Sequence, residues 1–447
     1  MNSSADSQSR NSKFRSLRSS LVGVLLAVAF IYVWILPLFR PRGDYLWGHY
    51  RLRDIYIGIP IGLAVLCTVL ILAVPAHRRR PLAARLVTVA IAIVSVLAAS
   101  DAVYALGFMG ALRSNYWLDQ AHISRRHSAA DAELGFVRKP FVSWRGYVSE
   151  VDRIVEYRAD KNGFRNSTET QRADIVFIGD SFTESATIVE ESTFVQRVAQ
   201  STGLSTVNLG RGAYGPQQEL IVLKRYGLPY QPRFVVWQLF EGNDLTDAEV
   251  FAEWKENPQQ VNTSWKRRYL DNSLLKHWLS NTRLQKPSGP MVSLRYVDGT
   301  SRRITLRYPY EPDQPSRMQL GMTETMQAIE AGHQLCESRG IELLVLFIPT
   351  MVRVMAPEIA FDRVEDQKRY APELQDRGDN FSGRINELCA RIGCNFVDSF
   401  DALRQAAPET NHNLYIPNDE HLDVGGHEVM TQIVERWVQS EGAAPRE

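Results

Sequence analysis

The chain has 447 residues, of which 45% are hydrophobic and 23% charged, and its net charge is +1. This length suggests two or three structural units, and the composition excludes a collagen-like, disulfide-rich or wholly disordered chain. The charge is unevenly distributed, because residues 1–110 hold 12 Lys and Arg against 4 Asp and Glu, whereas residues 111–447 hold 39 against 46. A net-acidic soluble part is a poor electrostatic match for nucleic acid, so no nucleic-acid partner is expected.

Three apolar runs near the N-terminus predict a membrane domain over residues 21–106. They cover residues 21–39, 55–74 and 86–106 and follow a basic tail at residues 1–20. Each run is long enough to cross about 30 Å of hydrocarbon as a helix. A cleaved signal peptide is the alternative for the first run, but no small-residue cleavage site follows it. We therefore expect three transmembrane helices in contact with membrane lipid.

The distribution of Lys and Arg predicts how these helices are oriented. With the N-terminus in the cytoplasm, the basic tail and the loop 75–85 place eight basic residues inside, against four in the outer loop 40–54. Cytoplasmic loops are enriched in Lys and Arg, so the count favours this orientation. It predicts a multi-pass protein of the inner or plasma membrane, with residues 107–447 outside the cytoplasm.

The soluble part is predicted to alternate strands with helices after a turn-rich transition segment at residues 107–171. Apolar, β-branched runs typical of buried parallel strands lie at residues 174–178, 205–209, 234–239, 342–348 and 394–397. Helical segments are predicted at residues 192–202, 217–227, 322–339 and 382–392, with a last helix after Gly426. This alternation predicts a mostly parallel sheet covered by helices on both faces. Residues 250–318 interrupt it and contain a predicted hairpin at residues 292–308.

The first of four polar motifs, Gly179-Asp-Ser-Phe-Thr183, directly follows the strand predicted at residues 174–178. Ligands of such sheets bind at the carboxyl ends of the strands. A glycine before Ser181 permits a tight turn that exposes the hydroxyl as a nucleophile. An ordinary strand-to-helix turn with a capping serine is the alternative.

The second and third motifs offer hydrogen-bond donors at the next two strand ends. The loop at residues 208–215 contains three glycines, and Gly212 could present its N–H to a substrate oxyanion. A phosphate-binding loop is the alternative, but its lysine is missing. In Glu241-Gly-Asn-Asp244, the side-chain amide of Asn243 could donate to developing negative charge, with a turn or helix cap as the alternative.

The fourth motif, at residues 418–427, brings an acid and a histidine together before the last helix. His421 lies two residues after Asp419, and a histidine base needs a carboxylate on its second ring nitrogen. His427 is the alternative base and Asp423 the alternative carboxylate. Metal binding by the two histidines is not expected, because a spacing of six residues does not place both on one helical face.

The order of these motifs resembles the SGNH (GDSL-type) hydrolase superfamily, in which four sequence blocks carry Ser, Gly, Asn and His. Ser181, Gly212, Asn243 and His421 match these four residues. The resemblance covers roughly residues 172–440, with an insertion at about 250–340. It implies a flavodoxin-like three-layer α/β/α sandwich and ester chemistry that needs no metal or organic cofactor. It also implies an oxyanion hole made by the N–H groups of Ser181 and Gly212 and the Asn243 amide.

One departure from the family pattern concerns the acid. The usual acid lies three residues before the histidine, where this chain has Asn418. An Asp-x-His arrangement resembles the membrane-associated SGNH-like proteins of bacterial polysaccharide O-acetylation, and it assigns the acid to Asp419.

Together these features predict a serine esterase that acts through an acyl-serine on an O-acylated glycan or a lipid ester of the cell envelope. An O-acyltransferase associated with envelope polysaccharide machinery would use the same residues. A catalytically silent glycan-binding or scaffold protein on this fold is the alternative from another class. Arg211 could bind an anionic substrate or be solvated, and Cys389 and Cys394 could pair or remain free thiols.

Overall fold

The computed structural model describes most of the chain in two compact units. The described residues are 24–36, 52–106, 127–148, 151, 153–256, 273, 290–306, 315–374, 381–409 and 413–442. One unit comprises residues 1–113 and 263–285, and the other residues 114–262 and 286–447. The predicted basic tail at residues 1–20 lies outside the described residues.

The first unit is helical. Its described helices are Val24–Ile35, which ends in a π-helical turn at Ile31–Ile35, α2 (Leu52–Ala73) and α3 (Ala76–Leu106). Among them, α3 alone is long and apolar enough to cross a membrane, over Ala76–Ala102.

The other two predicted spans correspond to shorter apolar helices, Val24–Ile35 and Ile57–Ala73. Residues 21–23 and 37–39, at the ends of the first predicted span, lie outside the described residues. The first turn of α2 carries Arg53 and Asp54, which shortens its apolar part. The structure also differs from the predicted loop at 75–85, because α3 begins at Ala76 and contains Pro81 as its sixth residue.

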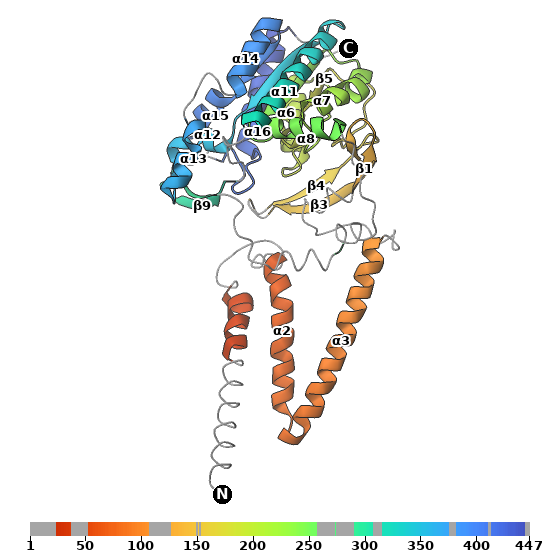
Figure 1. The fold of residues 1–447 in the computed structure, drawn as a ribbon, viewed down its shortest axis with the longest axis vertical. Coiled ribbons are helices and arrows are strands. Elements are labelled where there is room, and N and C mark those ends of the chain that lie inside the picture. The colour runs from red at the N-terminus through yellow and green to blue at the C-terminus, as the bar shows by residue number, and fades with distance from the viewer. Residues whose placement is uncertain are drawn as a thin grey trace. The chain divides into compact units, whose positions relative to one another are not determined.

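The second unit, which holds the labelled elements from β1 onward (Figure 1), is built on a five-stranded parallel sheet. Its strands are β5 (Ile175–Ile178), β6 (Thr206–Asn208), β7 (Phe234–Phe240), β10 (Glu342–Ile348) and β12 (Asn395–Asp398). Their spatial order is β12-β10-β7-β5-β6, which is the flavodoxin-like order 2-1-3-4-5. All five strands coincide with predicted ones to within one or two residues. The order reverses between β5 and β7, and ligands of such sheets bind at this switch point.

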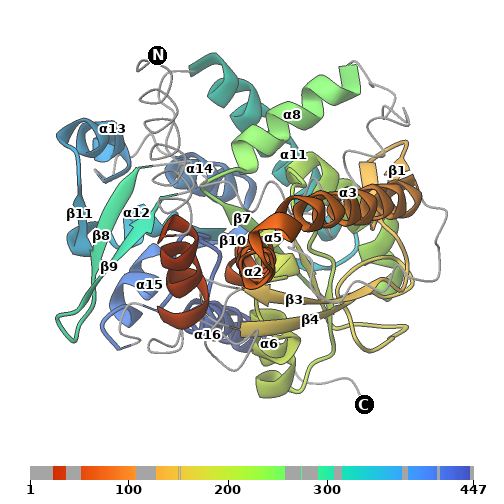
Figure 2. The ribbon, with the colours of Figure 1, turned by 90° about the horizontal axis from the view of Figure 1, so that it is seen from below.

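Helices cover both faces of the sheet and make three layers (Figure 2). On one face lie α6 (Phe194–Thr202), α12 (Met351–Val354), α15 (Phe400–Ala406) and α16 (Val424–Ser440). On the other lie α7 (Pro216–Val222), α8 (Asp244–Glu256), α11 (Pro315–Glu337) and α14 (Phe381–Ile392). Successive residues of each strand enter opposite cores, as when Phe177 packs with α6 and Val176 with α7, because side chains alternate across a strand. The predicted three-layer arrangement is thus present.

The segment predicted as a transition at residues 107–171 contains two antiparallel hairpins. They pair β1 (Ser128–Asp131) with β2 (Gly135–Arg138), and β3 (Ser143–Val148) with β4 (Arg153–Arg158). Residues 107–126 lie outside the described residues. Leu134 and Tyr157 are fully buried, so these hairpins form part of the second unit's core.

The segment at about 250–340 contains more than an insertion. The predicted hairpin is present as β8 (Met291–Arg295) and β9 (Ser301–Thr305), and β11 (Ile359–Phe361) pairs with β8. Helix α11 begins seven residues before its predicted start and packs on the sheet, with Ile329 fully buried. Helix α13 (Val364–Leu374) follows β11.

Candidate active site

Ser181 lies at the carboxyl end of a central strand. Strand β5 ends at Ile178, and Ser181 begins the short helix α5 (Ser181–Glu184). Gly179 between them has φ +153°, and a Cβ there would lie 2.5 Å from side-chain oxygens of Thr183 and Gln238, so glycine is required. The Asp180 carboxylate caps α5 by accepting a hydrogen bond of 2.9 Å from the Phe182 N–H. The N–H of Ser181 is one of the first-turn amides that a helix leaves without an intrahelical acceptor.

Ser181, His421 and Asp419 form one chain of hydrogen bonds. The Ser181 Oγ lies 2.8 Å from His421 Nε2, and His421 Nδ1 lies 2.5 Å from Asp419 Oδ1. A carboxylate can only accept, so Nδ1 carries the proton and Nε2 is left to accept from the serine hydroxyl. The structure therefore brings together the three predicted residues in the order that a serine nucleophile, a base and an orienting acid require.

The loop before α16 gives Asp419 and His421 their positions. Asn418 and Glu420, on either side of Asp419, have φ of +65° and +68°. Hydrogen bonds of 2.8 Å join the N–H groups of Ile416 and Glu420 to the carbonyls of His421 and Ile416, respectively. These bonds fold the loop back on itself and place Asp419 beside the imidazole two residues later.

Neither alternative residue of the fourth motif takes the place of His421 or Asp419. Asp423 caps α16 and pairs with Arg153 at 3.0 Å. His427 is buried, and its Nδ1 accepts a 3.2 Å hydrogen bond from the Phe194 N–H. Burial, with smaller contributions from neighbouring arginines, lowers the pKa of His427 to about 3. This histidine is therefore neutral and holds α16 against α6.

The Asn243 amide lies next to the nucleophile turn, just before α8. Its Nδ2 is 3.3 Å from Asp180 Oδ2, the atom that also lies 3.3 Å from Ser181 Oγ. A second, shorter contact of 2.6 Å joins Nδ2 to Asp247 Oδ2. The sequence reasoning did not identify Asp180 or Asp247 as residues that orient this amide. The only signal was the i,i+4 spacing of Asn243 and Asp247, after a motif for which a helix cap was one alternative.

Carboxylates gather beneath this turn. Asp180, Glu219 and Asp244 are fully buried, and Asp247 lies beside them. Burial, followed by the charge of Asp180, raises the pKa of Asp247 to about 7. Burial also raises the pKa of Asp180, although hydrogen bonds from Phe182 and Asn243 oppose it. Since these acids repel one another, the site favours keeping some of them protonated near neutral pH.

Gly212 is close to Ser181, but its N–H donates to Glu184. A Cβ on Gly212 would lie 3.3 Å from the Ser181 Cβ. Its N–H donates a 2.7 Å hydrogen bond to Glu184 Oε2, so in this structure it is not presented to a substrate oxygen. Arg211 is not solvated, which was one of the two alternatives considered from the sequence. It is 3% exposed and pairs with Glu184 at 3.3 Å.

Metal ligands and disulfides do not contribute to the described site. Within the ranges that the structure describes, no three His, Cys, Asp or Glu side chains form a group that could hold a metal ion. Cys389 and Cys394 are free thiols.

Comparison with known proteins gives a distant structural likeness. No family model matches the sequence, and no curated protein matches it. A protein of the G-D-S-L family from Desulfitobacterium hafniense DCB-2 is 14% identical, with 60% of this chain and 99% of that chain covered and a TM-score of 0.31. A GDSL-like lipase from Bacteroides thetaiotaomicron VPI-5482 is 12% identical, with coverage of 61% and 89% and a TM-score of 0.30. A catalytic mutant of an acetylxylan esterase from Geobacillus stearothermophilus is 11% identical, with coverage of 60% and 95% and a TM-score of 0.32.

Proposed function

We propose that this protein is a serine esterase that acts by acyl-serine chemistry on an O-acyl ester at the cell envelope. The observation that carries the proposal is the continuous hydrogen-bond chain from Ser181 through His421 to Asp419. A serine hydroxyl is a weak nucleophile unless an adjacent base removes its proton, and here the base is in contact with it. The chemistry requires no metal or organic cofactor.

The reaction has two steps. His421 Nε2 takes the Ser181 proton as Oγ attacks the ester carbonyl, and Asp419 stabilises the imidazolium that forms. The imidazolium returns its proton to the departing alcohol, which leaves an acyl-serine. Water, activated by the same histidine, then releases the acid. The oxyanion of each tetrahedral intermediate is stabilised by the Ser181 N–H and by the Asn243 amide, which gives up its long 3.3 Å contact with Asp180 Oδ2 to donate to it. The Gly212 N–H stays on Glu184, to which it donates at 2.7 Å.

A cavity near the histidine loop is compatible with a glycan ester as substrate. A cavity of about 490 Å³ opens beside this loop, between Pro417 and Asp423, which flank the Asp419–His421 pair. Its polar lining includes Arg153, Arg302 and Asn413. Its lining also includes Val151 and Val424, and it contains none of Ser181, Asp419 and His421. The O-acylated glycan is therefore proposed chiefly from the proposed location at the cell envelope.

The envelope location rests on the N-terminal helices. Helix α3 is long and apolar enough to span a membrane. With three spans and the Lys and Arg count of the flanking segments, the proposed topology is multi-pass, with residues 107–447 outside the cytoplasm. This placement would give the site access to envelope glycans.

The test uses the full-length protein in detergent. A fluorophosphonate probe should label the native protein and p-nitrophenyl acetate should be hydrolysed, while Ser181→Ala should lose both activities. Absence of labelling in folded native protein would contradict the proposal and favour a silent glycan-binding or scaffold protein. Sugar acceptors added to the ester assay should leave most of the acyl group as free acid. Capture of most acyl groups by the sugar would instead identify an O-acyltransferase, whose acyl-enzyme is protected from water.

A further inference from the structure

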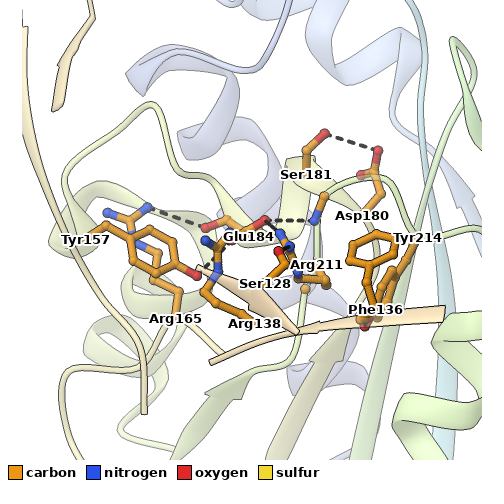
Figure 3. Close-up of polar contacts among 12 residues, drawn as sticks. Ser128, Phe136, Arg138, Tyr157, Arg165, Asp180, Ser181, Glu184, Arg211 and Tyr214 are labelled. Atoms are coloured by element: carbon orange, nitrogen blue, oxygen red, sulfur yellow. Dashed lines mark hydrogen bonds and ion pairs between the residues drawn. The ribbon is translucent and has the colours of Figure 1, made fainter. Parts of the chain in front are cut away.

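Glu184 is a buried acid, three residues after the nucleophile, that accepts from four donors (Figure 3). Its Oε1 accepts from the Arg138 guanidinium and from the Tyr157 hydroxyl, the latter at 2.8 Å. Its Oε2 accepts from the Gly212 N–H at 2.7 Å and from Arg211 Nη1 at 3.3 Å. With four donors on two oxygens, the hydrogen-bonding capacity of this carboxylate is filled.

These donors come from separate parts of the second unit. Arg138 ends strand β2 and Tyr157 belongs to β4, so both hairpins contribute one donor. Arg211 and Gly212 belong to the glycine loop after β6. Glu184 is the last residue of α5, whose first residue is Ser181. The carboxylate therefore joins the nucleophile helix to the glycine loop and to both hairpins.

The hairpins hold the Glu184 partners in fixed positions. The Arg138 guanidinium lies over the rings of Trp144 and Tyr157, 4.6 and 4.7 Å from their centroids, and these rings stack at 3.7 Å. Arg165 donates to the Ser185 carbonyl, and to the Ile188 carbonyl at 2.7 Å, so the chain after α5 is also fixed. Side chains that are buried and stacked in this way leave Glu184 little freedom to move.

The charges around Glu184 keep it ionised. Two buried arginines flank it, and their charges, with hydrogen bonds from Gly212 and Tyr157, hold its pKa well below the usual range despite burial. Protonation near neutral pH would leave both guanidinium groups buried without their counter-charge, which is strongly unfavourable. The hydrogen bonds and ion pairs of Glu184 therefore persist across the pH range in which an esterase works.

We propose that Glu184 is a positioning residue of the esterase site, which fixes the glycine loop against the nucleophile helix and commits the Gly212 N–H away from the oxyanion. Because it rests on the proposed function, the inference extends to catalysis only if Ser181 is the nucleophile. Glu184 acts through its neighbours: a Cβ on Gly212 would lie 3.1 Å from Glu184 Oε2 and 3.3 Å from the Ser181 Cβ. Movement of the loop would therefore press directly on the nucleophile.

The experiment compares Glu184→Gln with a matched control, Asp174→Asn. The glutamine amide has only one acceptor oxygen, and its NH₂ group would face other donors. The Gly212 N–H and the arginines can therefore no longer all donate to this side chain. Asp174 is likewise a buried acid, lies just before β5 at the end opposite Ser181, accepts from Ser205 Oγ at 2.7 Å and pairs with Arg233 at 3.9 Å. Both variants remove a buried negative charge, but only Glu184→Gln alters the glycine loop.

Two readouts are measured on full-length protein in detergent. For Glu184→Gln we expect kcat for p-nitrophenyl acetate to fall at least about tenfold with KM changed less than about threefold, because misplacement by about 1 Å can cost two orders of magnitude in rate. Hydrogen exchange in peptides covering residues 208–215 should become at least about tenfold faster. Asp174→Asn should lower the melting temperature but keep native kcat and native exchange in this loop.

The inference is overturned if folded Glu184→Gln keeps kcat within about threefold of native, if loop exchange is unchanged, or if Asp174→Asn has equal effects. Should Glu184→Gln fail to fold, Tyr157→Phe decides, because it removes one donor to Glu184 without changing charge. A folded Tyr157→Phe with native kcat and native loop exchange would overturn the inference. Native protein without esterase activity would refute the proposed function, while loop exchange would still show whether Glu184 holds the loop.

Discussion

The proposed role of Asp419 as the acid of the catalytic triad can be tested by replacing it with asparagine. In the structure, Asp419 Oδ1 lies 2.5 Å from His421 Nδ1. Asparagine keeps the size of the side chain and removes its charge. Its amide can also turn an N–H toward Nδ1, which stabilises the tautomer that cannot accept the Ser181 proton.

The expected loss of rate follows from the exposure of the pair. Opposite charges about 4 Å apart attract by roughly 4 kcal/mol at an effective dielectric constant of 20, and by about 1 kcal/mol in water. The side chains of His421 and Asp419 are 14% and 19% exposed, which places them nearer the first value. Since about 1.4 kcal/mol is tenfold in rate, Asp419→Asn should lower kcat by about 10²–10³.

The assay is steady-state hydrolysis of p-nitrophenyl acetate at pH 7–8, with Asn418→Gly as control. Asn418 has φ +65°, where glycine is unstrained, and its Oδ1 accepts a 2.8 Å hydrogen bond from the Thr305 N–H. The control loses this contact with β9 and should keep kcat within about threefold. The assignment of Asp419 as the acid would be refuted if Asp419→Asn changed kcat only slightly while Asn418→Gly lowered it strongly.

Three further predictions address the oxyanion, the buried acids and the membrane. Asn243→Ala should lower kcat by about 10²–10³ because an oxyanion donor is lost; near-native kcat in the ester assay would exclude this role. The pKa of Asp247 is raised from 3.8 to about 7, so between these values the folded protein holds a proton that the unfolded chain releases, and the resulting stability is lost as pH rises through 7. Thermal melts should therefore show Asp247→Asn gaining stability over native protein from pH 5 to pH 8, by at most about 3 kcal/mol, and a pH-independent difference would contradict this. A periplasmic-type enzyme reporter fused after Glu447 should be active only outside the cytoplasm, and an active cytoplasmic fusion would invert the proposed topology.

The sheet was predictable because its strands are short apolar runs that are buried on both faces. All seven residues of β7 are buried, and a short, nearly continuous apolar run of this kind is typical of a strand covered on both faces. Helix ends were less predictable. Helix α16 begins at Val424 and includes Gly426, where a Cβ would lie 2.4 Å from the Leu414 carbonyl oxygen. A glycine that usually disfavours a helix is here required by close packing, which local sequence does not reveal.

The site was predictable only as far as its motifs follow strands. Ser181, Asn243 and His421 could be placed together because parallel strands end at one edge of the sheet. The contacts of Glu184 could not be predicted, since Arg138 and Tyr157 precede it by 46 and 27 residues and lie on short strands of mixed polarity. The direction of the Gly212 N–H likewise depends on a buried side chain from another segment. Such long-range polar contacts leave no periodic pattern in a single sequence.

The hairpins change where the second unit's fold begins, relative to the motif resemblance. A fragment that starts at residue 172, where the motif resemblance starts, would lack Arg138, Tyr157 and Arg165. It would leave Glu184 with Arg211 as its only described ionic partner. It would also lack Leu134, so the core residues that pack against Leu134 would become exposed. The shortest autonomous catalytic fragment should therefore include residues from about 127 onward. Proteolytic nicking between the hairpins and β5 should then yield two pieces that stay associated until denatured.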